Sequence, residues 1–464
     1  MRLTAAILAA RAVAALSRGL RRGGGTALPG LIAERVDPGL VPTLAGRLGQ
    51  GSALVTGTNG KTTTARLVRG ICREAGLRPV ANSEGSNMMR GVAAALAESA
   101  RWDGSFPARE KRIGIFEVDE ATMPLVARSV EPRAALFTNL FRDQLDRYGE
   151  VETVATLWRT AVRSFPSEVT LALNADDPAV ASLSDVALGR VLLYGVDDET
   201  QAGGPLEHAA DARWCYACGG ELEYAVVFYG HLGHWRCPGC RRARPTPDVA
   251  VSALTKAQDG MNVTLTTPTG EVNVRLPFVG LYNAYNAAAA TALAVALGIE
   301  TQAVERGLAG ATAAFGRQER LAVDGRSVQV ILAKNPAGVN QVIRTITADG
   351  APKHLAVFLN DDLADGRDIS WIWDVDFELL SGSVASLVVS GRRAWDMALR
   401  LKYAGLGERP EVEHDAAAAL RRAIAATPEG GTLYVIPTYT AMLAVRNILG
   451  RWAGRGAFWE GDGR

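Results

Sequence analysis

The chain has 464 residues, enough for about three domains at roughly 150 residues each. Apolar residues make up 48% and charged residues 21%, which excludes wholly disordered, collagen-like and disulfide-knit proteins. The 50 Lys and Arg residues against 49 Asp and Glu leave a net charge of +1, without the basic excess typical of nucleic-acid-binding proteins. We therefore expect no nucleic-acid partner.

The first 20 residues are rich in alanine and leucine, but Arg2, Arg11 and Arg18 interrupt them. No uninterrupted apolar run reaches the roughly 18 residues of a transmembrane helix, and no clear small-x-small site indicates a cleaved signal peptide. We predict that residues 1–45 form an N-terminal helical segment, and two interpretations fit its first helix. Its first helix is either a basic amphipathic helix resting on an anionic membrane surface or an ordinary packed helix.

An α/β alternation follows, and we assign residues 46–320 to one domain. Strands that alternate with helical patterns indicate a mostly parallel sheet. The expected strands are Ser52–Thr56, Ile113–Val118, Ala134–Thr138 and Val169–Asn174, and the expected helices are Thr62–Ala75 and Ala284–Leu297.

The strongest catalytic signal is TGTNGKTT at residues 56–63, between a predicted strand and a predicted helix. Glycines in such a loop let backbone N–H groups converge on a phosphate, and the helix N-terminus adds partial positive charge. Lys61 would supply a charge to the β- and γ-phosphates, and Thr62 a hydroxyl to Mg²⁺. Val55 stands where the general pattern has glycine, so this is a variant loop, and a turn without a ligand is the alternative. The nucleotide-binding candidates here are Gly57, Thr58, Asn59, Gly60, Lys61, Thr62 and Thr63.

This variant loop resembles that of the Mur ligase superfamily, whose members use ATP to activate a carboxylate as an acyl phosphate. The resemblance implies a Mg²⁺ ligand at Glu117, which ends an apolar strand. It also implies nucleotide contacts at Asn283 and Asn286 in LYNAYN and at Arg317 in GRQE. The segments TNL and DQLD within residues 138–146 are similar to the family's TN…DHLD pattern.

Three departures from the Mur pattern bear on the second substrate. Gln144 and Tyr282 stand where ordinary Mur ligases have histidines, and AKNP at residues 333–336 replaces their YAHNP. No amino-acid-binding signature is visible in the C-terminal region. The resemblance therefore implies carboxylate activation without implying the usual amino-acid nucleophile.

Four of the five cysteines form two C-x-x-C pairs within residues 210–247, a stretch that interrupts the α/β pattern. Two such pairs 18 residues apart are typical of a tetrahedral Zn²⁺ site, and a closed Cys₄ set leaves no open position for water. We predict a structural zinc ribbon inserted in the ATP-binding domain, with fortuitous clustering as the alternative. The proposed ligands are Cys215, Cys218, Cys237 and Cys240. Thiolate ligands and a spare thiol fit a reducing cytoplasm.

A second α/β pattern, Rossmann-like in its alternation, occupies residues 321–464. Its expected strands are Val328–Ala333, Leu355–Asn360, Val384–Ser390 and Thr432–Pro437, and its expected helices are Trp395–Tyr403, Ala416–Ala426 and Thr440–Trp452. After the second of these strands comes an aspartate-rich loop that ends in ADGRDISWIWD at residues 364–374. Loops at the carboxyl ends of strands are where α/β folds place their sites.

Together, the Mur-type loop, the Cys₄ insertion and the ADGRDISWIWD segment resemble the MurT family over nearly the whole chain. The resemblance implies the synthetase subunit of lipid II isoglutaminyl synthase, a carbon–nitrogen ligase of peptidoglycan synthesis. It implies ATP and Mg²⁺ as cofactors, lipid II as substrate and a GatD-like glutaminase as partner in a heterodimer or larger complex. It further implies that Asp368 completes the glutaminase site in trans; a loop-capping aspartate is the alternative.

The cysteine count agrees with an external ammonia source. A glutaminase needs a nucleophilic cysteine and a histidine, but four cysteines are assigned to metal, and Cys72 lies on the helix after the phosphate loop. Two other functions remain: a Mur- or folylpolyglutamate-type ligase that adds an amino acid, and a zinc-ribbon binding protein that uses ATP to switch shape. We expect a cytoplasmic location, at the inner face of the membrane if the N-terminal helix rests there.

Overall fold

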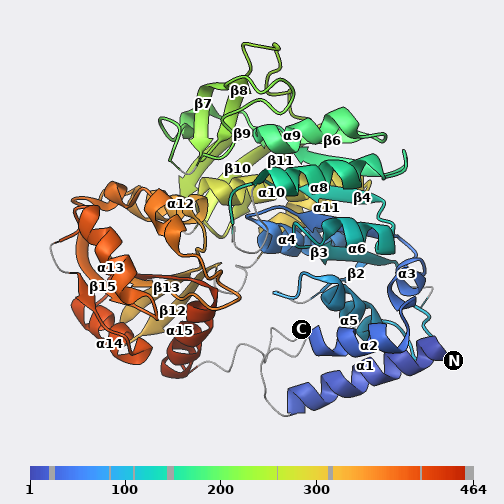
Figure 1. Cartoon of the computed structure of the whole chain (residues 1–464), viewed down its shortest axis with the longest axis horizontal. Helices are drawn as coiled ribbons and strands as arrows, with labels where there is room; N and C mark the ends of the chain where they lie inside the picture. Colours follow the sequence, from blue (N-terminus) through green and yellow to red (C-terminus); the bar gives the residue numbers. More distant parts are fainter. Residues whose placement is uncertain are drawn as a thin grey trace. The chain divides into compact units, whose positions relative to one another are not determined.

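The computed structural model describes residues 1–19, 27–82, 85–107, 110–143, 151–208, 210–258, 260–311, 317–407 and 410–454. The chain divides into two compact units (Figure 1). Unit 1 comprises Met1–Leu140, Val151–Gly204 and Ala212–Thr312; unit 2 comprises Phe141–Glu150, Pro205–Asp211 and Ala313–Arg464. The N-terminal helical segment therefore packs within unit 1, and two short internal segments pack with unit 2.

Unit 1 is built on a nine-stranded sheet in the order β11-β10-β9-β6-β5-β4-β1-β3-β2. Neighbouring strands from β2 to β9 in this order run parallel, whereas β10 pairs antiparallel with both β9 and β11. The strands are β1 (Ser52–Thr56), β2 (Arg78–Val80), β3 (Arg112–Glu117), β4 (Ala134–Phe137), β5 (Thr170–Asn174), β6 (Val191–Val196), β9 (Val249–Ala257), β10 (Gly260–Thr267) and β11 (Gly270–Leu276). Strand β1 is buried throughout, as expected for a central parallel strand.

Helices α4, α10 and α11 pack against one another and against this sheet, and α1, α2, α3 and α5 form an N-terminal helical layer. The helices of unit 1 are α1 (Arg2–Gly19), α2 (Ala27–Val36), α3 (Leu40–Ala45), α4 (Lys61–Glu74), α5 (Met89–Ser99), α6 (Met123–Val130), α8 (Val151–Arg163), α9 (Pro178–Ala181), α10 (Leu281–Ala296) and α11 (Thr301–Ala309), with short 3₁₀ turns η1 (Ser182–Val186) and η2 (Glu199–Gln201). Among the described residues, no helix is long and apolar enough to span a membrane.

The cysteine-rich insertion forms its own small sheet, a hairpin of β7 (Glu223–Tyr229) and β8 (Leu232–Arg236). In Figure 1 this hairpin lies next to the end of unit 1 that carries β9 and β10. The insertion is thus a separate two-stranded module, in agreement with the break in the α/β pattern.

Unit 2 is a three-layer α/β unit built on a six-stranded sheet in the order β12-β13-β17-β14-β15-β16. Alternate residues of β14 feed two cores: Leu355 and Val357 pack with α12 and α13, whereas Ala356 and Phe358 pack with α14 and α15. Only β12 pairs antiparallel within the described sheet. The elements are β12 (Arg317–Val323), β13 (Arg326–Ile331), α12 (Pro336–Thr347), β14 (Lys353–Phe358), η3 (Ser370–Asp374), η4 (Phe377–Leu380), β15 (Val384–Ser390), α13 (Ala394–Tyr403), β16 (Glu411–Val412), α14 (Ala416–Ala426), β17 (Thr432–Pro437) and α15 (Tyr439–Trp452). The predicted α/β fold class is confirmed.

Candidate active site

Three adjacent strands of unit 1 end at the same edge of the sheet. Strand β1 pairs with β3 on one side and β4 on the other, with Val55 opposite Glu117 and Thr56 opposite Phe137. The loops that follow these strands are therefore brought together at the carboxyl edge, where open α/β sheets bind their ligands. They are the phosphate loop after β1, residues 117–120 at the end of β3, and residues 138–140 after β4.

The phosphate loop needs its two glycines for steric reasons. Gly57 and Gly60 have φ values of 133° and 86°, which L-residues with a side chain rarely adopt. A Cβ on Gly57 would lie 2.0 Å from Thr138 Oγ1, and one on Gly60 would lie 2.2 Å from Asn286 Oδ1. The loop is thus pressed between the β4 loop and α10, and Gly60 is the N-cap of α4.

Lys61 is buried at the start of α4, with only 6% of its surface exposed. Its ammonium donates to the Gly57 carbonyl, to Thr58 O at 3.1 Å and to Glu120 Oε1 at 2.9 Å. Glu120 is also buried, so the two groups form a buried ion pair. This carboxylate and the loop carbonyls balance the Lys61 charge.

Thr62 and Glu117 make the contact expected of a Mg²⁺ site in a phosphate loop. Thr62 Oγ1 donates to Glu117 Oε1 at 2.9 Å, which places a hydroxyl beside a buried carboxylate at the helix N-terminus. Asn82 fixes the Glu117 backbone from the side: its Nδ2 donates to Glu117 O at 2.9 Å, and its Oδ1 accepts from Glu117 N at 3.0 Å. Such oxygen groups are what Mg²⁺ prefers.

The β4 loop holds the middle of the phosphate loop. Asn139 Oδ1 accepts from the Asn59 backbone N–H at 2.8 Å, and the Thr138 hydroxyl donates to Asn59 O at 2.8 Å. The Thr58 N–H donates to Asn139 O at 2.9 Å. The TNL segment noted in the sequence therefore acts on the phosphate loop through the backbone of Thr58 and Asn59.

Helix α10 brings its two asparagines to the same loop. Asn286 Oδ1 accepts from Thr64 Oγ1 at 3.3 Å, and Asn286 Nδ2 donates to Asn283 Oδ1 at 3.2 Å. Asn283 in turn donates to Val279 O at 2.8 Å. Both side chains are buried, so this chain of amides is held rigidly beside α4.

The remaining sequence candidates lie elsewhere or outside the described part. Thr63 is half-buried on α4 next to the loop. Arg317 begins β12 in unit 2, and its side chain lies outside the described residues, as does all of Gln144. Sequence reasoning missed Glu120 and Asn82. Three carboxylates within residues 117–120, directly after a buried strand, were the available signal for Glu120.

Asp368 is an exposed residue of unit 2, at the end of the aspartate-rich loop. Its Oδ1 accepts from the Ser370 backbone N–H at 2.8 Å, at the start of η3. Other aspartates of this loop have different partners: Asp362 pairs with Arg392 at 2.8 Å, and Asp365 accepts from the Thr440 N–H at 2.8 Å. Asp368 thus makes the contact that the alternative, a loop-capping aspartate, predicts, and its carboxylate is open to solvent.

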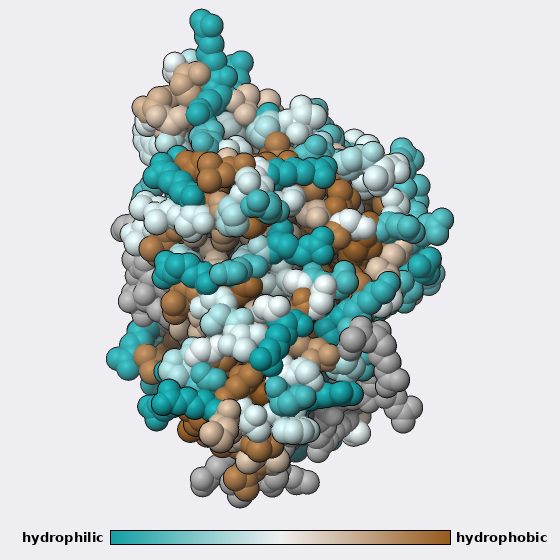
Figure 2. All heavy atoms as spheres, turned by 90° about the vertical axis from the view of Figure 1, so that its right-hand side faces the viewer, coloured by the Kyte–Doolittle hydropathy of each residue, from teal (hydrophilic) through white to brown (hydrophobic). Residues whose placement is uncertain are grey.

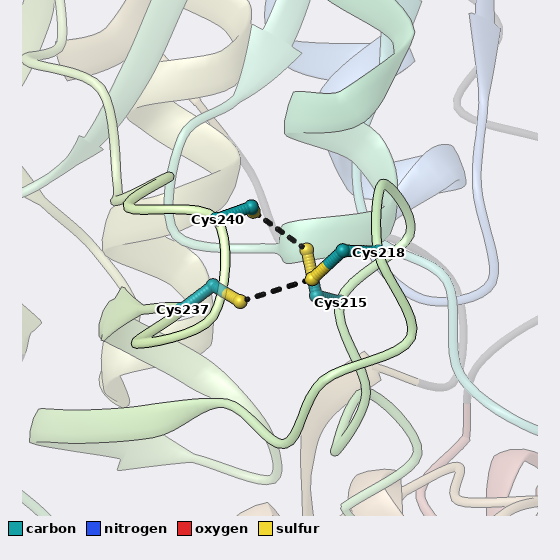
Figure 3. Close-up of side chains that lie close together, drawn as sticks. All are labelled: Cys215, Cys218, Cys237 and Cys240. Carbon is teal, nitrogen blue, oxygen red and sulfur yellow. Dashed lines mark hydrogen bonds between the residues drawn. The ribbon is translucent and has the colours of Figure 1, made fainter.

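The four clustered cysteines converge as the spacing predicts (Figure 3). Their sulfur atoms lie within 4.8 Å of one another, with Cys215 and Cys240 Sγ 3.6 Å apart and Cys218 and Cys237 Sγ 3.4 Å apart. Zn–S bonds of about 2.3 Å in a tetrahedron require S···S distances of about 3.8 Å. The four thiols therefore form a group that could hold a metal ion, and their geometry fits Zn²⁺.

The two halves of this metal site have the same local backbone. The Gly219 N–H donates to Cys215 O at 2.8 Å, and the Arg241 N–H donates to Cys237 O at 2.9 Å. Both Gly219 and Arg241 have positive φ, 71° and 63°. Each C-x-x-C pair is thus closed by a left-handed residue directly after its second cysteine, as in paired metal-binding turns. The backbone N–H of Cys240 lowers the pKa of the Cys237 thiol to about 7.

Buried polar contacts anchor the ribbon to the sheet of unit 1. Fully buried Asp176, after β5, accepts from Arg244 Nε at 2.5 Å and from the Tyr285 hydroxyl at 2.6 Å. Burial raises the pKa of Asp176, and Arg244 and Tyr285 oppose that shift. Neighbouring Asp177 contacts His231 Nε2 at 3.3 Å and accepts from the Leu140 N–H at 2.8 Å. The Asp177 carboxylate thus joins the ribbon to the loop after β4, which holds Asn59.

We predict one zinc ion per chain, and a loss of stability when a ligand is removed. Cys215→Ser should lower the zinc content and reduce Tm by at least about 5 °C, because a structural zinc contributes directly to folding free energy. Elemental analysis of freshly purified protein and thermal unfolding measure both effects. Cys72→Ala is the matched control and should keep its zinc. A zinc-free wild-type protein would contradict the assignment.

Comparisons with known proteins agree with this geometry. A family model described as Mur ligase middle domain matches residues 55–231, and one described as MurT ligase C-terminal matches residues 332–442. The crystal structure of MurF from Acinetobacter baumannii superposes with a TM-score of 0.67 at 17% identity, covering 90% of this chain and 80% of that one.

Two relatives extend the similarity over nearly the full length. Lipid II isoglutaminyl synthase (glutamine-hydrolyzing) subunit MurT of Streptococcus pneumoniae is 32% identical over 432 residues, covering 92% of this chain and 93% of that protein. The MurT subunit of Staphylococcus aureus strain COL is 32% identical over 431 residues, with the same coverage.

Fold and sequence together define an ATP-dependent ligase of the Mur type, a class that implies ATP and Mg²⁺ as cofactors. Within that class, the chain belongs to the MurT family. The family members named above are subunits, so a complex with a second protein is implied.

Proposed function

We propose that this chain is the synthetase subunit of a lipid II isoglutaminyl synthase. It amidates the α-carboxylate of D-glutamate in the stem peptide of lipid II, converting that residue to D-isoglutamine. The observation that carries the proposal is the MurT similarity over 92% of the chain, which includes the C-terminal unit as well as the ATP-binding one. Ordinary Mur ligases are similar in fold, which by itself does not select the nucleophile.

The reaction has two balanced steps. An oxygen of the substrate carboxylate attacks the γ-phosphorus of ATP, the bond to the bridging oxygen breaks, and ADP leaves. Ammonia then attacks the acyl carbon of the acyl phosphate, the C–O bond to phosphate breaks, and a proton is lost as the amide forms. Both steps develop negative charge on phosphate oxygens, so fixed positive groups at that position lower the barrier.

The residues of the phosphate loop have distinct roles in this scheme. Glu120 and loop carbonyls hold Lys61 at the helix N-terminus. From this position its ammonium can turn to the β- and γ-phosphates. Backbone N–H groups from Gly57 to Lys61 cradle the phosphates. Thr62 and Glu117 would hold Mg²⁺, which when bound neutralises phosphate charge. Asn283, Asn286 and Arg317 are proposed to contact the nucleotide.

Ammonia is proposed to come from a GatD-like glutaminase, in a heterodimer or larger complex. Burial raises the pKa of the Cys72 thiol to about 12, so this cysteine is a poor nucleophile at neutral pH. The other four cysteines form the metal group, for which we propose structural Zn²⁺. This chain is therefore poorly equipped to hydrolyse glutamine itself. A requirement for ATP and a thiolate metal site also suit a reducing cytoplasm.

Amidation is tested by purifying the chain with its glutaminase partner and supplying lipid II, ATP and glutamine. Mass spectrometry should detect replacement of one carboxyl OH by NH₂, dependent on both ATP and glutamine. Ammonium at high concentration should replace glutamine when the partner is omitted. Incorporation of a free amino acid instead would favour the alternative, a Mur- or folylpolyglutamate-type ligase, and would contradict the proposal.

A further inference from the structure

Helix α1 has apolar side chains on two opposite faces. Its inner face, which includes Ala6, Ile7, Ala10 and Ala14, is buried against α2 and α5. The outer face of α1 is also apolar but open to solvent, and it comprises Ala5, Leu8, Ala12, Ala15 and Leu16. A helix on the surface of a water-soluble protein normally carries polar residues on its outer face. A helix that is apolar on all sides is normally buried on all sides.

The exposure of this outer face is large and regular. Leu8 is 52% exposed and Leu16 is 65% exposed, two turns apart on the same side of the helix. Figure 2 views the molecule from the side that carries the N-terminus, where hydrophobic surface reaches solvent between hydrophilic side chains. Trp102, in the turn after α5, is also 64% exposed, and exposed tryptophans are enriched at membrane–water interfaces.

The inner contacts hold α1 in place. Arg11 donates to carbonyls at the C-terminal end of α5, to Ala97 O at 3.3 Å, to Glu98 O at 3.2 Å and to Ala100 O. These carbonyls lack helical N–H partners, so a guanidinium there satisfies them and complements the helix dipole. The outer face is therefore presented by a docked helix.

The net positive charge of the N-terminal sequence selects the occupant of this face. Five arginines precede the first acidic residue of the chain, Glu34; on α1, Arg2 is exposed at the start of the helix, whereas Arg11 contacts α5. Two copies of such a helix would bring like charges together, whereas an anionic lipid surface complements them. The 18 residues of α1 extend about 27 Å, but its arginines and its inner contacts keep it from crossing a bilayer.

We propose that the outer face of α1 docks the protein on an anionic membrane surface, with its leucines in the headgroup region. This inference rests on the proposed function in one respect only, since a lipid substrate gives such docking its purpose. Apolar burial and attraction between arginines and anionic lipids would act together, as in other interfacial helices.

Vesicle flotation with the full-length chain tests this docking without ATP or lipid II, so its outcome is independent of amidation. The wild-type chain should float with vesicles of phosphatidylglycerol and phosphatidylethanolamine, weakly with phosphatidylcholine alone, and less as salt screens the charges. Leu8→Glu/Leu16→Glu should weaken binding to anionic vesicles at least about tenfold. The control Leu125→Glu/Leu188→Glu, at exposed leucines elsewhere in unit 1, should bind as wild type.

The uncharged variant Leu8→Gln/Leu16→Gln separates lost apolar contact from added repulsion and should also bind less well. Thermal unfolding should be unchanged in both α1 variants, because the replaced side chains are exposed. Failure of the wild-type chain to bind anionic vesicles would overturn the proposal. So would a dimer in solution that Leu8→Glu/Leu16→Glu dissociates, since a second copy would then be the occupant. If amidation fails but flotation succeeds, the docking inference stands without its proposed purpose.

Discussion

Replacement of Lys61 by alanine is expected to reduce ATP-dependent amidation at least about 100-fold, whether ammonia comes from glutamine or from added ammonium. The Lys61 ammonium is the described positive group nearest the phosphate loop backbone, which it contacts at Gly57 O and Thr58 O. Its removal takes away charge stabilisation of the phosphoryl groups in both steps. Initial rates of ADP release and of amide formation measure the loss.

The same substitution has a second consequence, because Lys61 and Glu120 are a buried pair. Removing one partner of such a pair leaves an uncompensated charge and costs about 3–5 kcal/mol of stability. Lys61→Ala by itself would therefore mix a catalytic and a folding defect. The double variant Lys61→Ala/Glu120→Gln removes the stranded carboxylate and should recover most of the wild-type Tm while remaining inactive.

Recovery of turnover in that double variant would contradict the phosphate-loop assignment. Glu117→Ala is an independent check on the same site. It removes the carboxylate that accepts from Thr62, and should raise the Mg²⁺ concentration needed for half-maximal activity while leaving the Lys61 pair in place. Wild-type Mg²⁺ dependence in Glu117→Ala would exclude Glu117 as a ligand.

The parts of the fold that sequence patterns predicted are those with local signals. Strand β1 and the glycine loop after it, the buried strand β3 and the two C-x-x-C pairs are each recognisable within a few residues. The antiparallel edge of the large sheet, β9 to β11, escaped notice. In β10 and β11 buried residues alternate with polar ones, and in β9 only the first three residues are buried, so no continuous apolar run like that of β1 marks these strands.

The missed residues of the candidate site depend on tertiary neighbours. Glu120 lies two residues beyond the predicted strand Ile113–Val118, and only the loop geometry turns it toward Lys61. Asn82 follows the short strand β2, which was not predicted, and reaches Glu117 because β2 pairs with β3. Asp177 caps the N-terminus of α9 by accepting from the Ala179 and Val180 N–H groups. The structure adds that it also accepts from Leu140 and contacts His231 of the ribbon.

Asp368→Asn is expected to reduce glutamine hydrolysis by the complex at least about 100-fold, with amidation driven by ammonium unchanged. A Cys/His pair works best when a carboxylate orients the imidazole and stabilises its cation, and an amide cannot do the second. The Asp368 carboxylate is exposed, and its described contact is the Ser370 N–H, so it is open to a partner. Exposed Trp373 lies on the η3 turn that follows, with its ring centroid 5.8 Å from that of Tyr403 in a tilted arrangement, and could contact that partner.

Asparagine at position 368 separates the two roles of this residue, because an amide oxygen can still accept from the Ser370 N–H. The cap and the fold of the loop should survive, so subunit pairing in size-exclusion chromatography should match wild type. Asp415→Asn is the matched control: this exposed aspartate of unit 2 accepts from the Ala418 N–H at 2.7 Å in the same capping manner. It should hydrolyse glutamine normally. The phosphate loop belongs to the other compact unit, so amidation driven by ammonium should not depend on Asp368. Equal losses with glutamine and with ammonium in Asp368→Asn would contradict this expectation and show that Asp368 serves the acyl-phosphate step or the fold.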